Sequence, residues 1–350
     1  VHNQASMRYL VTGATGHMGT HLVSQLVEDG HDVIALTRSR SNANHLPDEA
    51  TVTEGDVTSK DTLRGPMTGV DGVFHLAAWT PVGPGPWNVD RAERVNVHGT
   101  RNVLDLMDEL DIPKLVYTSG LGVFSGNSDQ PYDESWTPET PTVAVHFRTL
   151  WEAHYEVARP MMDEGLPLVV VLPGAIYGPI ERAPQAGKPR GAFRDYLLGD
   201  LPMIPRGFRM HWEHAEDTAR NHIRAMNDGV PGEEYIIASA ESRTMVELFE
   251  LAEEITGIPA PRAVHPAVFG GLAKIMSLVE RVTRPPEGLE SELLGWFAGR
   301  DYRADNSTAV RDLGIEHRPL KEGLGEYLRW EMDRLGIDRP LRLRRGGRRR

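Results

Sequence analysis

Cysteine is absent from this 350-residue chain, which excludes disulfide bonds and catalysis by a thiolate. Long apolar runs are absent too, because none reaches the roughly 20 residues that a membrane-spanning helix needs. The first seven residues are polar and do not resemble a signal peptide. We therefore expect a protein without a membrane segment that resides in the cytoplasm. Its hydrophobic content of 40% suffices for a large core.

Lysine is scarce, with five residues against 33 arginines, and six of those arginines lie in the last ten positions. These ten positions hold no acidic residue, so the net charge of −12 for the whole chain leaves −18 for the rest. A body this acidic disfavours binding to nucleic acid. We expect residues 336–350 to form a disordered basic tail, with contact to an anionic partner as the alternative.

Short apolar segments alternate with helix-compatible segments as far as about residue 175. Strands are predicted at 8–11, 33–36, 51–53, 72–76, 114–118 and 168–172, and helices at 21–28, 92–110 and 144–164. Such alternation predicts parallel strands with right-handed crossovers, that is, an α/β doubly wound sheet. Glycine and proline then break the rhythm. We divide the chain into a dinucleotide-binding domain at 7–177 and a mainly substrate-binding domain at 178–335, with segments that return to the first.

The most informative motif, TGATGHMG at 12–19, follows the first predicted strand and opens a helix. Glycine at 13 permits a tight turn, glycine at 16 admits a pyrophosphate, and glycine at 19 lets the helix pack closely. This context predicts a Rossmann-type site in which the helix N-terminus holds the phosphates of a dinucleotide. The alternative is a glycine-rich turn without a ligand. The candidate contacts in the loop are Gly13, Thr15, Gly16, His17 and Met18.

Several shorter motifs occur downstream in a characteristic order. They are Gly55–Val57, His75–Ala78, Asn96–Val103, Pro173–Pro179, Glu216–Ala219 and Asp305–Ser307. With these motifs and the glycine loop, the chain resembles the extended short-chain dehydrogenases/reductases over nearly all of residues 7–335. That group includes nucleotide-sugar epimerases and dehydratases, dihydroflavonol reductases and 3-beta-hydroxysteroid dehydrogenases. The resemblance implies a Rossmann fold with a smaller C-terminal substrate-side domain.

The resemblance also implies roles for individual residues. Asp56 and Val57 would contact the adenine of the cofactor. The nicotinamide ribose would lie against Leu76, Ala77 and Ala78. The segment with Pro173, Ala175 and Ile176 would lie beside the nicotinamide amide.

The end of the second predicted strand bears on the choice of cofactor. An acidic residue there would bind the 2′-hydroxyl of NAD, whereas this chain has Thr37-Arg38-Ser39-Arg40. A guanidinium group suits the 2′-phosphate of NADP, so Arg38 favours NADP. NAD stays an alternative, with Arg38 stacked on the adenine.

The catalytic positions depart from the pattern of the group, which uses a serine or threonine and a tyrosine followed four residues later by lysine. The register of the surrounding motifs places Gly120, His146 and Leu150 at these three positions. Leucine cannot tune the pKa of a neighbour. An imidazole ordinarily titrates near neutrality, so His146 is our candidate acid or base, with Ser119 and Thr118 as nearby hydroxyl groups. Alternatively, His146 fills the start of its helix.

Other candidate residues are weaker. Tyr155 and Arg159 have tyrosine-to-base spacing but come nine residues too late. His154 lies about 12 Å along the helix from His146, too far to share a metal ion, and no metal site is predicted. Asn96 is expected to hold backbone near the site. Candidates for substrate contact are Trp79, Trp87, Phe208, His211 and Trp212, with core packing as the alternative for each.

Three functions are compatible with this sequence. The first is an NADP-dependent oxidoreductase or epimerase acting on a small carbonyl or secondary alcohol compound, and we favour it. The second is a non-redox isomerase, lyase or cyclase that retains the dinucleotide as a structural element. The third is a dinucleotide sensor without turnover. The apolar segment 270–282 would cover the pocket or form a subunit contact, which leaves a homodimer open.

Overall fold

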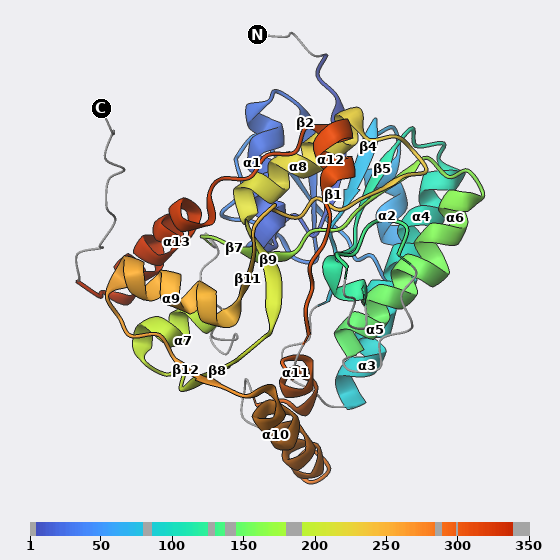
Figure 1. Cartoon of the computed structure of the whole chain (residues 1–350). Helices are drawn as coiled ribbons and strands as arrows, with labels where there is room; N and C mark the ends of the chain where they lie inside the picture. Colours follow the sequence, from blue (N-terminus) through green and yellow to red (C-terminus); the bar gives the residue numbers. More distant parts are fainter. Residues whose placement is uncertain are drawn as a thin grey trace, which may run out of the picture.

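The computed structural model describes residues 5–79, 86–124, 130–136, 145–179, 191–283, 289–298 and 300–338 (Figure 1). A seven-stranded parallel sheet lies at its centre, in the order β10-β6-β5-β4-β1-β2-β3. Its strands are β1 Arg8–Thr12, β2 Asp32–Thr37, β3 Thr51–Glu54, β4 Gly72–His75, β5 Leu115–Thr118, β6 Leu168–Val171 and β10 Glu234–Tyr235. The predicted doubly wound sheet is confirmed, and β10 is a strand that the sequence pattern did not reveal.

Helices cover both faces of this sheet (Figure 1). Buried side chains of α1 (His17–Glu28), α8 (Ala215–Asp228) and α12 (Ser307–Leu313) join one apolar cluster. Those of α2 (Lys60–Met67) and α4 (Gly99–Glu109) join another. Because side chains alternate along a strand, β1 sends Leu10 to one cluster and Val11 to the other. Both faces are therefore buried, which explains why the strands are apolar throughout.

The two long predicted helices each contain a π-helical stretch. The first consists of α3 (Pro86–Ala92), the π-helical η2 (Glu93–His98) and α4; the second of α5 (Val145–Trp151), the π-helical η4 (Glu152–Ala158) and α6 (Arg159–Asp163). Arg148 of α5 joins them, with Nη2 2.9 Å from Oε1 of Glu93 and Nη1 2.7 Å from Oε1 of Glu152. Such stretches occur frequently at functional sites.

The remaining elements flank the carboxyl edge of the main sheet. One small sheet consists of β7 Ala175–Tyr177, β9 Arg209–His214 and β11 Ser242–Thr244, and another of β8 Met203–Pro205 and β12 Arg262–Val264. Two short 3₁₀ helices are η1 Arg40–Asn42 and η3 Leu121–Val123. The α-helices are α7 Ala192–Leu198, α9 Met245–Thr256, α10 Pro266–Val279, α11 Ser291–Trp296 and α13 Leu320–Leu335. The strand β10 and the helices α8 and α12 follow residue 178 yet belong to the layers of the main sheet. The predicted tail lies outside the described residues from 339 onward.

Candidate functional site

The glycine loop joins β1 to α1 at the carboxyl edge of the main sheet. Gly13 has a φ of +71°, and a Cβ there would lie 2.9 Å from the backbone N of Ala77. A Cβ on Gly19 would collide with the carbonyl oxygen of Gly13, so the close approach of helix to loop requires glycine. Gly16 caps α1 without a side-chain hydrogen bond. The N-terminal N–H groups of α1 thus face the loop, an arrangement that binds phosphate.

Three buried polar side chains tie the strands together beneath this loop. The Thr12 Oγ1 lies 2.7 Å from Nδ1 of His75, whose Nε2 lies 3.1 Å from Oγ1 of Thr100. The backbone N–H of Ala77 donates to the same Thr12 hydroxyl over 3.2 Å. Burial lowers the pKa of His75 to about 4, so its ring is neutral at pH 7. This network, which sequence reasoning missed, holds residues 76–79 against the glycine loop.

A cavity of about 250 Å³ opens between the loop and the carboxyl ends of β1, β2, β3 and β4. Nine of the fourteen predicted cofactor residues line it: Gly13, Thr15, Gly16, Arg38, Asp56, Val57, Leu76, Ala77 and Ala78. Six further residues complete the lining: Leu36, Thr37, Asn42, Gly55, Trp79 and Val95. The fold therefore brings together segments that are up to about 80 residues apart, at the edge where doubly wound sheets bind ligands.

The remaining predicted cofactor residues lie outside this lining: His17, Met18, Pro173, Ala175 and Ile176. Met18 is buried in the apolar cluster beneath α1. Burial, with His21 nearby, lowers the pKa of His17 to about 4. His17 lies at the N-terminus of α1, beside the backbone of Gly178 and Pro179 after β7.

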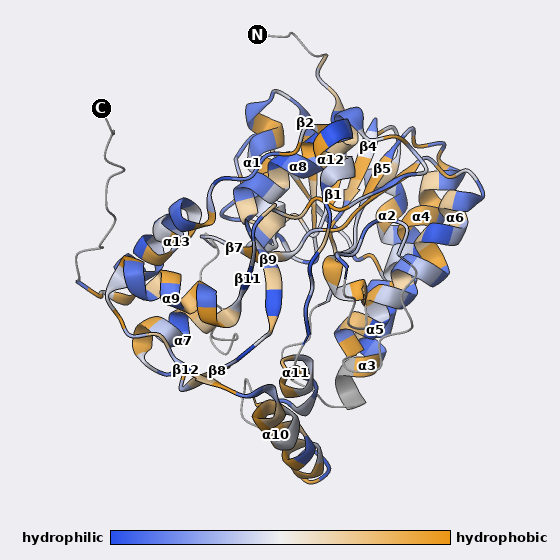
Figure 2. Ribbon diagram, viewed as in Figure 1, coloured by the Kyte–Doolittle hydropathy of each residue, from blue (hydrophilic) through white to orange (hydrophobic). Residues whose placement is uncertain are grey.

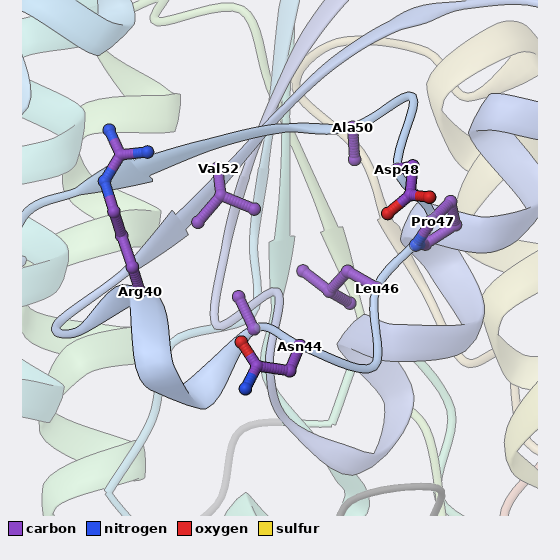
Figure 3. A pocket seen from close by; sticks show the side chains of 8 residues that line it. Arg40, Asn44, Leu46, Pro47, Asp48, Ala50 and Val52 are labelled. Atoms are coloured by element: carbon purple, nitrogen blue, oxygen red, sulfur yellow. The ribbon is translucent and has the colours of Figure 1, made fainter.

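The two arginines after β2 face different hollows. Arg38 lines the cavity at the glycine loop, together with Asn42. Arg40 lines a separate hollow of about 260 Å³ between η1, residues 43–50 and β3. Figure 3 shows Arg40 at one side of that hollow and Pro47 and Asp48 at the opposite side. Only Arg38 is therefore placed to contact a ligand in the cavity at the glycine loop.

His146 lies in the first turn of α5, next to the segment that follows β4. Its imidazole is half-buried and lies against the backbone of Trp79, which lines the cavity, whereas His146 itself is not part of that lining. Burial lowers the pKa of His146 to about 4, although the neighbouring backbone of Trp79 acts in the opposite direction. Its Nδ1 is buried and has no hydrogen-bond partner among the described residues. At neutral pH the ring is therefore uncharged.

Asn96 of η2 clamps the same segment. Its Oδ1 accepts the backbone N–H of Trp79 over 2.6 Å, and its Nδ2 donates to the Trp79 carbonyl over 3.1 Å. The Nδ2 also donates to Oγ1 of Thr149 over 2.9 Å, and this hydroxyl donates to the carbonyl of His146 over 3.1 Å. As expected from the sequence, Asn96 holds backbone near the site. It also joins η2 to the turn of α5 that carries His146.

The hydroxyl groups of Thr118 and Ser119 point to opposite faces of the sheet. Thr118 Oγ1 lies 2.9 Å from Nε2 of His222 on α8. Ser119 Oγ lies 2.8 Å from Nδ1 of His154, whose Nε2 lies 3.1 Å from Oε1 of Glu234. All of these side chains except Thr118 are buried. Both hydroxyl groups therefore bind histidines within the core, and the Ser119–His154–Glu234 chain was not foreseen.

Gly120 and Leu150, the other two positions at which the sequence predicts a departure from the group, differ in what surrounds them. A Cβ built on Gly120 would meet only the carbonyl oxygen of Pro173, at 3.6 Å, so a side chain has room there. Leu150 packs against the apolar cluster beneath the sheet. Tyr155 and Arg159 contact each other, with the guanidinium carbon 5.6 Å from the ring centre, and the Tyr155 hydroxyl is buried without a hydrogen-bond partner.

A buried glutamate supports the segment that follows β6. The Oε1 of Glu213 accepts the backbone N–H of Gly174 over 2.6 Å, and its Oε2 accepts a hydrogen bond from Thr218 over 3.2 Å. Burial raises the pKa of Glu213 to about 8 despite these hydrogen bonds. A Cβ on Gly174 would lie 2.7 Å from the carboxylate, which explains the glycine at this position. The single acidic residue of β9, between Trp212 and His214, is the signal that could have identified Glu213.

Most of the aromatic candidates for substrate contact serve packing. Phe208 is buried among Trp296, Phe297 and Tyr302. His211 accepts the backbone N–H of Ala304 at Nε2, and its Nδ1 lies 2.6 Å from the carbonyl of Ser239. Of the candidates, only Trp79 lines the cavity. The side chain of Trp87 lies outside the described residues.

The described ranges contain neither a cluster of metal-binding side chains nor a membrane-spanning helix. No three or more histidine and acidic side chains gather there as they would to hold a metal ion. None of the helices in those ranges combines the length and the apolar character needed to cross a membrane.

Known proteins resemble this chain along most of its length. Sterol demethylase protein B of Methylococcus capsulatus is 29% identical over 343 residues, which cover 94% of this chain and 99% of the relative. A putative dihydroflavonol 4-reductase of Synechocystis is 29% identical over 338 residues, 92% of this chain and 94% of the relative. The structure of the dTDP-glucose 4,6-dehydratase DesIV from Streptomyces venezuelae with NAD superimposes with a TM-score of 0.74 over 94% of this chain and 98% of the other, at 22% identity. That likeness shows the fold alone.

The fold and the cavity at the glycine loop thus define a member of the extended short-chain dehydrogenase/reductase class. The model of the NAD-dependent epimerase/dehydratase family matches residues 9–238. The chain belongs to this family, and its relatives include proteins named as reductases.

Proposed function

We propose that the protein is an NAD(P)-dependent oxidoreductase that acts on an apolar carbonyl or secondary alcohol compound, with His146 as the proton-transfer group. The observation that carries this proposal is the position of His146, whose ring lies against the segment that lines the cavity. A neutral imidazole beside the cavity is a group that can exchange a proton with a substrate oxygen.

The residues of the cavity fit a nicotinamide dinucleotide. The spaces beside Gly13 and Gly19 exclude a Cβ, as the close packing of a phosphate-binding loop requires. The N-terminus of α1 would hold the pyrophosphate, Asp56 and Val57 the adenine, and Ala77 and Ala78 the nicotinamide ribose. When bound, the nicotinamide supplies the acceptor or donor of hydride.

The neutral state of His146 gives the proton transfer a direction. Because burial lowers its pKa to about 4, His146 is a base at pH 7 and accepts the hydroxyl proton of a secondary alcohol as the carbon loses hydride. In the reverse direction, the same nitrogen returns the proton to the carbonyl oxygen. Asn96 and Thr149 hold the turn that carries His146, so the base keeps its position during turnover.

The first experiment identifies the cofactor and tests for hydride transfer. The purified protein is analysed by mass for a bound dinucleotide, and absorbance at 340 nm is followed while secondary alcohols and carbonyl compounds are added. We expect turnover with an apolar substrate and a loss of about 10²- to 10⁴-fold in kcat for His146→Ala. The matched control is His222→Gln, which alters a buried histidine on the other face of the sheet. Equal losses in both variants would contradict a catalytic role for His146.

We further propose that Arg38 selects NADP by binding its 2′-phosphate. The support is its place in the lining of the cavity, at the carboxyl end of β2. For Arg38→Ala we expect the affinity for NADP to fall about tenfold or more and that for NAD to change little, because a charge-assisted contact contributes about 1.5–3 kcal/mol. Arg40→Ala, which alters the separate hollow, is the control. An unchanged ratio of the two affinities in Arg38→Ala would refute the proposal.

The altered catalytic positions support a second candidate, a non-redox reaction or sensing with a bound dinucleotide. Leu150 offers no ammonium group, and Gly120 no hydroxyl, although Gly120 has room for a side chain. A bound dinucleotide that never changes oxidation state with any compound of the panel would favour this candidate.

A further inference from the structure

Exposed apolar side chains gather on α10 and the segment that follows it. Eight large apolar side chains of the described residues are substantially exposed, and five of them belong to this part of the chain. The five are Val268, Ile275, Leu278, Val282 and Leu289. Figure 2 shows hydrophobic positions along α10, which extends away from the central sheet at the edge of the molecule.

Three of these residues, Val268, Ile275 and Leu278, form one stripe along α10, because they are separated by seven and three positions, the spacing that places side chains on one helix face. Val282 adds to this stripe from the turn that follows the helix. Exposure reaches 58% at Ile275, 59% at Leu278 and 89% at Val282. The opposite face of α10 carries Phe269 and Met276, which are buried against Leu294 of α11. The helix therefore has one apolar face that is packed and another that is open.

Positive charges border the open stripe. Lys274 and Arg281 are exposed next to it, and α10 itself contains no acidic residue. The carboxylate of Glu280, in the turn after α10, accepts hydrogen bonds from the backbone N and the Oγ of Ser291 at the start of α11 over 2.7 and 2.6 Å. The stripe thus has a cationic margin on a chain whose net charge is −12.

The stripe is too small for a stable protein interface of its own. Four aliphatic side chains of this kind bury at most about 500 Å². A standard interface buries about 800 Å² on each partner. An apolar stripe with lysine and arginine at its margin is instead the pattern of helices that lie in the surface of a lipid bilayer.

We propose that α10 and the turn after it dock on a bilayer with anionic headgroups, with Ile275, Leu278 and Val282 inserted below the headgroups. Lys274 and Arg281 then contact the phosphates. The helix α11 transmits this position to the candidate site. Its Glu292 accepts the backbone N–H of Val145 at the start of α5 over 3.0 Å, and its Trp296 stacks on Phe147 at 5.0 Å. The helix that carries His146 is therefore fastened to the docked part of the molecule.

The test is sedimentation of the full chain with vesicles of equimolar phosphatidylcholine and phosphatidylglycerol. We expect the protein to sediment with these vesicles and the partition coefficient to fall at least about tenfold in Ile275→Asp/Leu278→Asp, because two charged side chains cannot enter the apolar layer. Val310→Asp is the matched control, since Val310 of α12 is an exposed apolar residue (48%) away from the stripe. It should bind vesicles as the unmodified protein does.

The cationic margin has a test of its own. Lys274→Glu/Arg281→Glu should weaken binding to the anionic vesicles by at least about fivefold for each charge, and salt should reduce the difference. Binding to pure phosphatidylcholine should change little.

Several results would overturn the proposal. One is the absence of vesicle binding by the unmodified protein, and another is an equal loss in Val310→Asp. A concentration-dependent dimer that Ile275→Asp/Leu278→Asp abolishes, without vesicle binding, would show that a second copy covers the stripe. Binding of dinucleotide and turnover are measured without vesicles, so failure of the proposed function is separate from failure of this proposal.

Discussion

At the scale of single residues, the glycines of the loop after β1 are required by the atoms around them. Gly19 lies inside α1, where glycine is otherwise unfavourable by about 0.5–1 kcal/mol relative to alanine. The carbonyl oxygen of Gly13 occupies the place of its Cβ. The cost to the helix is thus offset by the close approach of α1 to the loop.

A substitution at this position tests that argument. In Gly19→Ala the new methyl group must displace the loop, so we expect a loss of about 1–3 kcal/mol in the free energy of unfolding and weaker dinucleotide binding. Gly271→Ala is the control, because Gly271 is also helical but nothing lies within 4 Å of its Cβ position. It should leave stability unchanged or raise it by up to about 1 kcal/mol. Urea unfolding and titration with dinucleotide measure both effects, and equal stability of the two variants would contradict the prediction.

At the scale of elements, the site depends on contacts between two helices that are interrupted by π-helical stretches. Asn96 lies in η2 and hydrogen-bonds both the Trp79 backbone and Thr149 of α5. The junction between the two helices, formed by Asn96 and Thr149, positions His146, because the hydroxyl of Thr149 donates to the His146 carbonyl.

Removal of the junction should therefore disturb both stability and ligand binding. For Asn96→Ala we expect a loss of about 2–4 kcal/mol in stability, since three hydrogen bonds disappear and buried backbone groups of Trp79 lose their partner. Thr149→Val removes only one of these bonds and should cost about 1 kcal/mol. Urea unfolding gives the stabilities, and the fluorescence of added NADPH measures its binding in the cavity. A cost for Asn96→Ala no greater than that for Thr149→Val would be inconsistent with this junction.

At the scale of the whole molecule, buried titratable groups determine how stability depends on pH. Burial lowers the pKa of His75, His146 and His222 from 6.5 to about 4. The contribution of these three neutral histidines to the free energy of unfolding is present above pH 6.5. It is lost as the pH falls toward 4, because the unfolded chain then binds more protons than the folded chain. Glu213 acts in the opposite sense. Its pKa rises from 4.5 to about 8, so its contribution is present below pH 4.5 and is lost as the pH rises through 8.

The two effects together predict a stability maximum near pH 6.5. Between pH 6.5 and pH 8, the folded chain retains the proton of Glu213 that the unfolded chain has released, so the free energy of unfolding should fall by up to about 2 kcal/mol. Glu213→Gln should abolish this loss on the alkaline side and leave the acid side unchanged. Urea unfolding at about pH 5, 6.5 and 8 measures the loss of stability on the acid and the alkaline side of the maximum. The prediction fails if Glu213→Gln retains the alkaline slope of the unmodified protein.

Much of the fold could be predicted because its signals are local. Apolar runs separated by helical segments predicted the central strands to within a residue or two, and TGATGHMG identified the loop at their edge. The strand β10 was missed because two residues, Glu234 and Tyr235, carry no periodicity. The π-helical stretches were missed because their apolar pattern is close to that of an ordinary α-helix.

The doubly wound architecture and the family follow from the sequence alone, since they depend on residue types in a fixed order, whereas the departures at positions 120, 146 and 150 stay predictions. Tertiary structure alone decided which side chains meet. It directs Ser119 to His154 and Thr118 to His222, places His146 against Trp79, and leaves one face of α10 open. The physical reason is that burial and hydrogen bonding depend on neighbours from distant parts of the chain, which no local pattern specifies.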